Sequence, residues 1–94
     1  MGQIFNELSQ LINKKNLNAI YAYIVTKVAN TGLGILERGE IINAVIESNK
    51  NSILNQKIVI TLGLPHYLVT IYVDQNDNIN SKVTTIYNTE KPIL

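Results

Sequence analysis

His66 is the only histidine of the chain, and histidine is the side chain whose ordinary pKa lies nearest neutrality. Cleavage of RNA by its own 2′-hydroxyl needs a base for that hydroxyl and an acid for the leaving 5′-oxygen. His66 could serve as either group. The alternative interpretation is that His66 is an ordinary residue beside the turn at Pro65.

A second group of side chains could bind the phosphate on which such a reaction acts. Hydroxyl groups would donate hydrogen bonds to the phosphate, and cations would neutralise its charge. The candidate donors are Tyr72, Thr84, Thr85 and Tyr87, and the candidate cations are Arg38, Lys57 and Lys82. Threonine and tyrosine are also common in any strand, and residues 38–40 could simply begin a helix.

The composition excludes or disfavours several classes of site. The chain has no cysteine, which excludes disulfides and thiolate-bound metals. This fits a cytoplasmic location and equally a domain that must cross a membrane unfolded. Glu37, Glu40 and Glu47 form no metal-ligand spacing with the histidine, and no nucleotide-binding or hydrolase motif is present. We therefore expect no metal and no cofactor. The net charge of +1 counts against a protein that binds nucleic acid by charge alone.

Helices are expected in the first half of the chain. The apolar residues of the first segment recur on one helix face, which predicts a helix over residues 3–14. A second helix should begin with Asn16 or Asn18 as its N-cap and stop at residues 30–32. A third is expected from residues 38–40 to about residue 48. Its expected buried stripe is Ile41, Ile42, Val45 and Ile46.

The apolar pattern changes from helical to alternating near residue 52, which predicts strands at 57–62, 66–73 and 82–87. Tyr67, Val69, Ile71 and Val73 should face the helices, so that His66, Thr70 and Tyr72 lie on an open face. The expected shared core is Ile24, Val28, Ile42, Val45, Val69 and Ile71. Together these patterns predict a single α+β domain over residues 1–94. Helices at about 3–48 would pack on one face of an antiparallel β-meander at about 53–88.

The helix expected at residues 38–46, followed by the segments 66–73 and 83–87, resembles small toxin ribonucleases of the barnase–EndoU–colicin–RelE superfamily. Many of these are C-terminal domains of contact-dependent inhibition toxins and other polymorphic toxins of bacteria. The resemblance implies metal-independent cleavage of RNA, often tRNA, in the cytoplasm of a target cell, and a cognate immunity protein as partner. It implies His66, Thr84, Thr85 and Tyr87 as catalytic residues, with Arg38 and Lys82 binding the substrate beside Tyr72, the donor expected from its hydroxyl group.

Two other functions fit the same sequence. A low charged content and a single histidine also fit a non-catalytic protein-binding module, such as an immunity protein or a phage-encoded inhibitor. A membrane-active toxin domain would use the apolar residues 17–36. Lys27 lies near the middle of that segment, where a charge opposes insertion, so membrane association is not expected.

Overall fold

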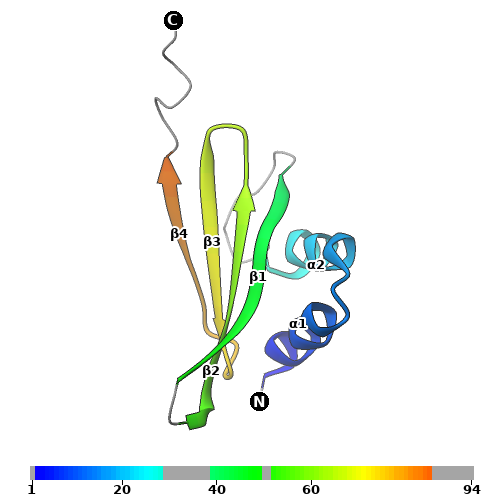
Figure 1. The fold of residues 1–94 in the computed structure, drawn as a ribbon, viewed down its shortest axis with the longest axis vertical. Coiled ribbons are helices and arrows are strands. Elements are labelled where there is room, and N and C mark those ends of the chain that lie inside the picture. Colours follow the sequence, from blue (N-terminus) through cyan, green and yellow to red (C-terminus); the bar gives the residue numbers. More distant parts are fainter. Residues whose placement is uncertain (1, 29–38, 50–51, 86–94) are drawn as a thin grey trace, which may run out of the picture.

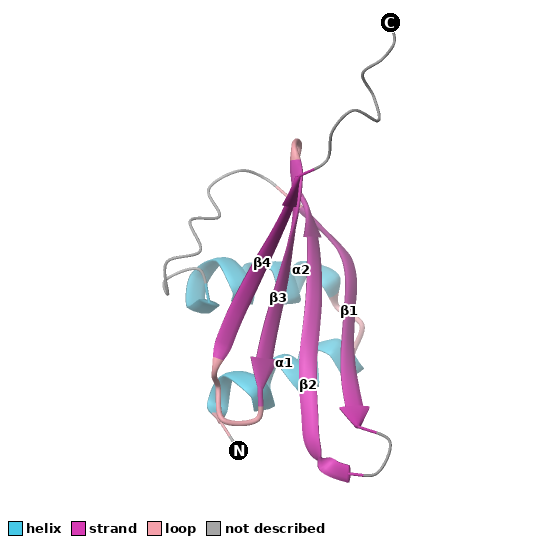
Figure 2. Cartoon of the chain, turned by 90° about the vertical axis from the view of Figure 1, so that its left-hand side faces the viewer, coloured by secondary structure: helices cyan, strands magenta, loops and turns pink. Residues whose placement is uncertain are grey.

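The computed structural model describes residues 2–28, 39–49 and 52–85, and Figure 1 shows their arrangement. Two helices and a π-helical turn precede four strands, which pair in sequence order as one antiparallel meander. The elements are α1 (Gln3–Asn13), α2 (Leu17–Tyr23), η1 (Ile24–Val28), β1 (Glu40–Asn49), β2 (Ser52–Gly63), β3 (Tyr67–Asp74) and β4 (Ile79–Thr85). Both helices lie on one face of the sheet (Figure 2), which confirms the predicted α+β architecture.

α1 spans nearly the predicted residues, whereas α2 begins at a predicted N-cap, ends as an α-helix at Tyr23 and continues as the π-helical turn η1 to Val28. α1 ends at Asn13, and the chain reverses at Lys15, whose φ of 57° lies in the left-handed region. Asn16 then caps α2, because its side-chain oxygen accepts a hydrogen bond of 3.1 Å from the backbone N–H of Ala19. This confirms the first of the two expected N-caps. The expected stop at residues 30–32 lies outside the described residues.

The predicted third helix is wrong, because residues 40–49 form strand β1. A β-bulge between Ile41 and Asn43 inserts one extra residue into the pairing with β2. The bulge interrupts the alternation of a strand, so that neighbouring apolar residues imitate a helical stripe. Pairing with β2 along the whole segment outweighs that local pattern, and the sheet therefore begins at Glu40 instead of near residue 53.

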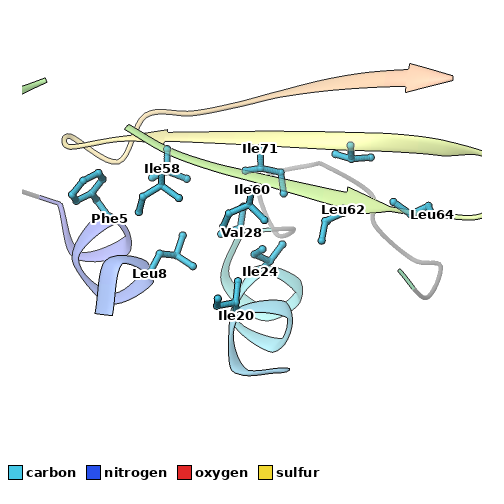
Figure 3. Close-up of a cluster of buried hydrophobic side chains, with 12 residues drawn as sticks. Phe5, Leu8, Ile20, Ile24, Val28, Ile58, Ile60, Leu62, Leu64 and Ile71 are labelled. Atoms are coloured by element: carbon cyan, nitrogen blue, oxygen red, sulfur yellow. The ribbon is translucent and has the colours of Figure 1, made fainter. Parts of the chain in front are cut away.

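The helix-facing side of the sheet is built by three rows of paired residues. Leu62 pairs with Val69, Ile60 with Ile71 and Ile58 with Val73, and all six side chains are buried. The predicted orientation of β3 is therefore confirmed. Figure 3 shows side chains from these strands meeting those of the helices. The helices contribute Phe5, Leu8, Ile20, Ile24 and Val28.

Two members of the expected core lie elsewhere. Ile42 is the bulged residue of β1 and is 57% exposed. Val45 pairs with Val59 on the face away from the helices and is half-buried. Both were assigned to the core on the assumption that β1 is a helix. The strand register instead places Val45 on the open face and leaves Ile42 unpaired in the bulge. Ile24, Val28, Val69 and Ile71 are buried as predicted.

The turn between β3 and β4 fixes the start of α1. The Asp77 carboxylate accepts hydrogen bonds from the backbone N–H groups of Ile4 (3.0 Å) and Phe5 (2.8 Å). Gly2, the N-cap residue, offers no side-chain hydrogen bond, and its N–H donates to the Gln75 carbonyl over 2.7 Å. A Cβ atom on Gly2 would collide with the Asp77 carboxyl group, so the close approach itself requires glycine.

Candidate functional site

The sequence predicts a functional site on the face of the sheet that is turned away from the helices (Figure 2). The register gives it two central rows. One is formed by Asn43, Thr61, Thr70 and Lys82, and the other by Val45, Val59, Tyr72 and Asn80. The face therefore combines hydroxyl, amide, apolar and aromatic side chains without a dominant chemistry.

The register separates the candidates on β4. Thr84 pairs with Leu68 and Lys82 with Thr70, so both lie on the open face. Thr85 pairs with Tyr67, which belongs to the helix-facing side. Thr84 and Thr85 therefore point to opposite faces of the sheet and cannot act together on one phosphate. Two further residues predicted for the site, Arg38 and Tyr87, lie outside the described residues.

Tyr72 lies at the centre of the open face. Its ring is half-buried, and the Lys57 ammonium group sits 5.9 Å from the ring centroid, within range of a cation–π contact. Asp74 follows at the end of β3. Hydrogen bonds from the Asn78 side chain and from the Asn78 and Asn76 backbone lower the pKa of Asp74, because they stabilise the carboxylate. This carboxylate organises the β3–β4 turn.

His66 is exposed in the bend between β2 and β3. The bend is closed by the Leu64 N–H, which donates to the Tyr67 carbonyl over 2.9 Å. Asp74 lies at the far end of the same face, since an extended strand rises about 3.4 Å per residue and β3 runs from Tyr67 to Asp74. About 20 Å or more thus separates the histidine from that carboxylate, too far for a shared proton transfer.

The charges of the open face do not favour a polyanion. By register, the described residues of this face carry three carboxylates, on Glu40, Glu47 and Asp74, and two ammonium groups, on Lys57 and Lys82. Three negative and two positive charges leave one negative charge in excess. Phosphate binding depends on an excess of cations, so the described part of this face is poorly suited to RNA.

A groove lies elsewhere, between β1 and the corner that joins α1 to α2. It measures about 720 Å³. On the helical side it is lined by Ile12, Asn13, Lys15, Leu17 and Ile20, and on the sheet side by the five consecutive residues 42–46. Consecutive residues of a strand point alternately to opposite faces. A groove that they all line must therefore follow the edge of β1 and not one of its faces.

A second hollow of about 550 Å³ continues along the same edge. It is lined by Leu17, Asn18, Tyr21 and the first residues of the strand segment, Gly39, Glu40 and Ile41. The Gly39 N–H donates to the Tyr21 hydroxyl over 3.1 Å, which holds the start of β1 against α2. The two hollows share Leu17, so together they follow β1 from residue 39 to residue 46.

The sequence did not point to this groove, because residues 40–48 were assigned to a helix and a helix has no strand edge. The β-branched residues Ile41, Ile42, Val45 and Ile46 were the signal that could have identified the strand. Two exposed apolar side chains mark the groove, Leu17 at 51% and Ile42 at 57% exposure. Val83 on β4, at 60%, is the other exposed large hydrophobic residue among those described.

One titratable pair joins the two helices. The Tyr23 hydroxyl donates to the Glu7 carboxylate over 2.5 Å. This hydrogen bond, together with one from Gln3, lowers the pKa of Glu7. Burial raises the pKa of Tyr23 above the ordinary range of tyrosine, and the neighbouring Glu7 carboxylate adds to the effect. The pair tethers α1 to α2 and lies apart from the lining of the groove.

Among residues 2–28, 39–49 and 52–85, no group of three or more His, Asp or Glu side chains could hold a metal ion. No helix in the same ranges is long and apolar enough to cross a membrane. Comparison with known proteins finds no family, no curated protein and no solved structure that matches the chain.

Proposed function

We propose that this domain is a protein-binding module that receives an extended strand of a partner along the outer edge of β1. The observation that carries the proposal is the pair of hollows that follow this edge from residue 39 to residue 46. In the described sheet β1 pairs only with β2. An edge strand offers unpaired N–H and C=O groups, and a strand that adds to them extends the sheet.

The two edges of the sheet differ in a way that supports this choice. β4 carries Lys82 at its centre and is exposed over residues 80–85. A lysine on an edge strand opposes pairing with other chains. β1 contains no lysine or arginine and is rich in isoleucine and valine. Of the two edges, β1 is thus the one that retains the capacity to pair.

The walls of the groove define how a partner would be held. Backbone hydrogen bonds to β1 would supply register, whereas the accessible side chains of Ile12 and Leu17 would contact apolar side chains of the added strand. Removing apolar area from water contributes about 25 cal/mol per Å². An exposed Leu17 is therefore a source of affinity as long as the partner covers it.

A library of extended peptides of about ten residues tests the proposal. Binding to the intact chain should be lost in Leu17→Glu and in Ile42→Lys, which place a charge in the groove. Val83→Lys is the matched control, because this valine is as exposed but lies on β4. Binding that survives both groove variants and is lost in Val83→Lys would move the site to β4. Failure of every peptide to bind would overturn the proposal.

A second candidate is the metal-independent toxin ribonuclease. The observation that favours it is the register that places Lys82 and Thr84 on the open face beside Thr70 and Leu68, at the end where His66 is exposed. In this hypothesis His66 exchanges the proton and Lys82 contacts the phosphate, with Thr84 on β4 between them and Tyr72 about 20 Å from His66 along the extended strand β3. RNA would be the substrate and an immunity protein the partner.

Incubation with total tRNA in the presence of a chelator tests the ribonuclease hypothesis. His66→Ala should lower the cleavage rate by about 10²- to 10⁴-fold, the usual contribution of a general acid or base. Asn76→Ala, an exposed change in the β3–β4 turn at the other end of the face, is the control. No cleavage by the parent protein, or full cleavage by His66→Ala, would eliminate this mechanism.

A further inference from the structure

The groove along β1 has a different charge at each of its two ends. Lys15 lines the part of the groove that faces residues 42–46. Glu40 lines the continuation, together with Gly39 and Ile41. The groove is apolar between them, with Leu17 common to both parts. A strand lying along β1 would therefore pass the Lys15 ammonium group on its helical side near one end and the Glu40 carboxylate near the other, whereas Glu47 lies beyond the first end on the open face.

We infer that the partner segment, if the proposed strand-binding function holds, runs antiparallel to β1. We also infer that it carries an acidic residue near its N-terminal end and a basic residue near its C-terminal end. An antiparallel strand passes residue 46 before residue 40, so its beginning meets Lys15 and its end meets Glu40. Antiparallel pairing continues the pattern of the whole sheet and is the more stable arrangement per residue. Between the two charges, alternate side chains are apolar.

The alternation follows from the surroundings of β1. Side chains of the added strand that point to the helical side would meet Ile12 and Leu17, so valine or isoleucine fits there. Side chains on the other face would lie next to Asn43 and Val45, at the border of the solvated face. Threonine suits those positions, because it favours strands and keeps a hydroxyl in water.

A second copy of this chain is a poorer occupant than such a segment. β1 contains Glu40 and Glu47 and no basic residue. If two β1 strands paired antiparallel about Ala44, with the bulged Ile42 of each left out of the pairing, Glu40 of each copy would lie opposite Glu47 of the other. Like charges that face each other across strands destabilise the pair.

The experiment uses synthetic peptides of about nine residues with alternating valine and threonine. One begins with glutamate and ends with lysine, and a second has the two charges exchanged. Titration of the intact, ¹⁵N-labelled chain reports binding. The first peptide should bind about threefold to tenfold more tightly than the second at low salt, as expected for two exposed ion pairs. Amide hydrogens within residues 42–46 should become protected from exchange.

Exchange of a charge on the protein makes the test specific. Lys15→Glu should invert the preference, so that the peptide beginning with lysine binds more tightly. Lys14→Glu makes the same charge change at an exposed neighbour that does not line the groove, and it should leave the order unchanged. A peptide methylated on its backbone nitrogens should not bind, because it cannot donate to the edge of β1.

The outcomes separate this inference from the function on which it rests. If both peptides bind equally well and protect residues 42–46, strand binding holds and the inferred charge polarity is overturned. If neither binds and library peptides also fail, the strand-binding function fails as well. Sedimentation that shows a concentration-dependent dimer of the free chain, lost in Leu17→Glu, would replace the peptide partner by a second copy.

Discussion

Replacement of Asp77 tests how the β3–β4 turn holds the first helix. The Asp77 carboxylate accepts two backbone hydrogen bonds, of 3.0 and 2.8 Å, from the first turn of α1. The Asp77 carboxylate thus replaces an N-cap side chain, because Gly2 at the N-cap position has no side chain that could accept a hydrogen bond. Loss of an N-cap side chain costs about 0.5–2 kcal/mol, and hydrogen bonds to charged groups are worth about 1.5–3 kcal/mol. We therefore expect Asp77→Ala to lower the free energy of unfolding by about 2 kcal/mol.

Three substitutions separate the hydrogen bonds from the backbone conformation. Asp77 has a φ of 64°, a region that asparagine and glycine tolerate better than alanine. Asp77→Asn keeps one acceptor and the conformation, and should lose about 1 kcal/mol, mainly from the missing charge at the helix N-terminus. Asp77→Gly loses both acceptors without strain and should lie between Asn and Ala.

Urea denaturation followed by far-ultraviolet circular dichroism measures these losses. For a domain of this size, 2 kcal/mol corresponds to a lowering of Tm by about 8–16 °C. Asn76→Ala is the control, since this exposed neighbour engages the turn through its backbone N–H. A loss below about 0.5 kcal/mol in Asp77→Ala, the usual range of neutral surface changes, would refute the anchoring of α1 by this turn.

Three further predictions follow from the core and from the tyrosine–carboxylate pair. In urea denaturation, Ile71→Ala should lower the free energy of unfolding by about 2–5 kcal/mol, because this side chain is fully buried. Ile42→Ala should lower it by less than about 1 kcal/mol, because this side chain is exposed. Equal losses would contradict the register of β1. The lowered pKa of Glu7 gives stability that is present above the unfolded-state pKa of about 4.3 and is lost as the pH falls. Tyr23→Phe should therefore flatten the acid side of the stability profile, and an unchanged profile would exclude the pair. The raised pKa of Tyr23 gives stability that is present below pH of about 10 and is lost above it; Tyr23→Phe should remove this alkaline loss from a profile of Tm against pH.

The elements that could be predicted from the sequence are those whose apolar spacing, turn residues or capping residue fit only one type of secondary structure. Apolar residues at every second position of 67–73 mark β3 and its buried face, and the Asp/Asn-rich turn marks the reversal to β4. The Asn16 cap fixes the start of α2 because its short side chain reaches the N–H of Ala19. In each case a local physical cause, visible within a few residues, decides the structure.

β1 could not be predicted in the same way. Its bulge at Ile42 shifts the alternation by one residue, so that apolar pairs fall at helical spacing. Which structure forms depends on pairing with β2, the next strand along the chain, and not on the apolar pattern of the segment itself. The candidate site shares this dependence. The separation of Thr84 from Thr85, and the presence of Lys82 beside Thr70, follow from register that tertiary pairing alone sets.

Binding and stability lie on different parts of this domain. The buried side chains connect the helices to β2 and β3, and Asp77 fixes α1 from the turn after β3. The residues that line the groove at its exposed margin, Leu17 and Ile42, contribute little to that core. Leu17→Glu and Ile42→Lys should thus change the free energy of unfolding by no more than about 0.5 kcal/mol. If either variant unfolds the domain, the edge of β1 is needed for folding and is not a free binding surface. If both remain folded and lose peptide binding, the edge of β1 is left open for a partner.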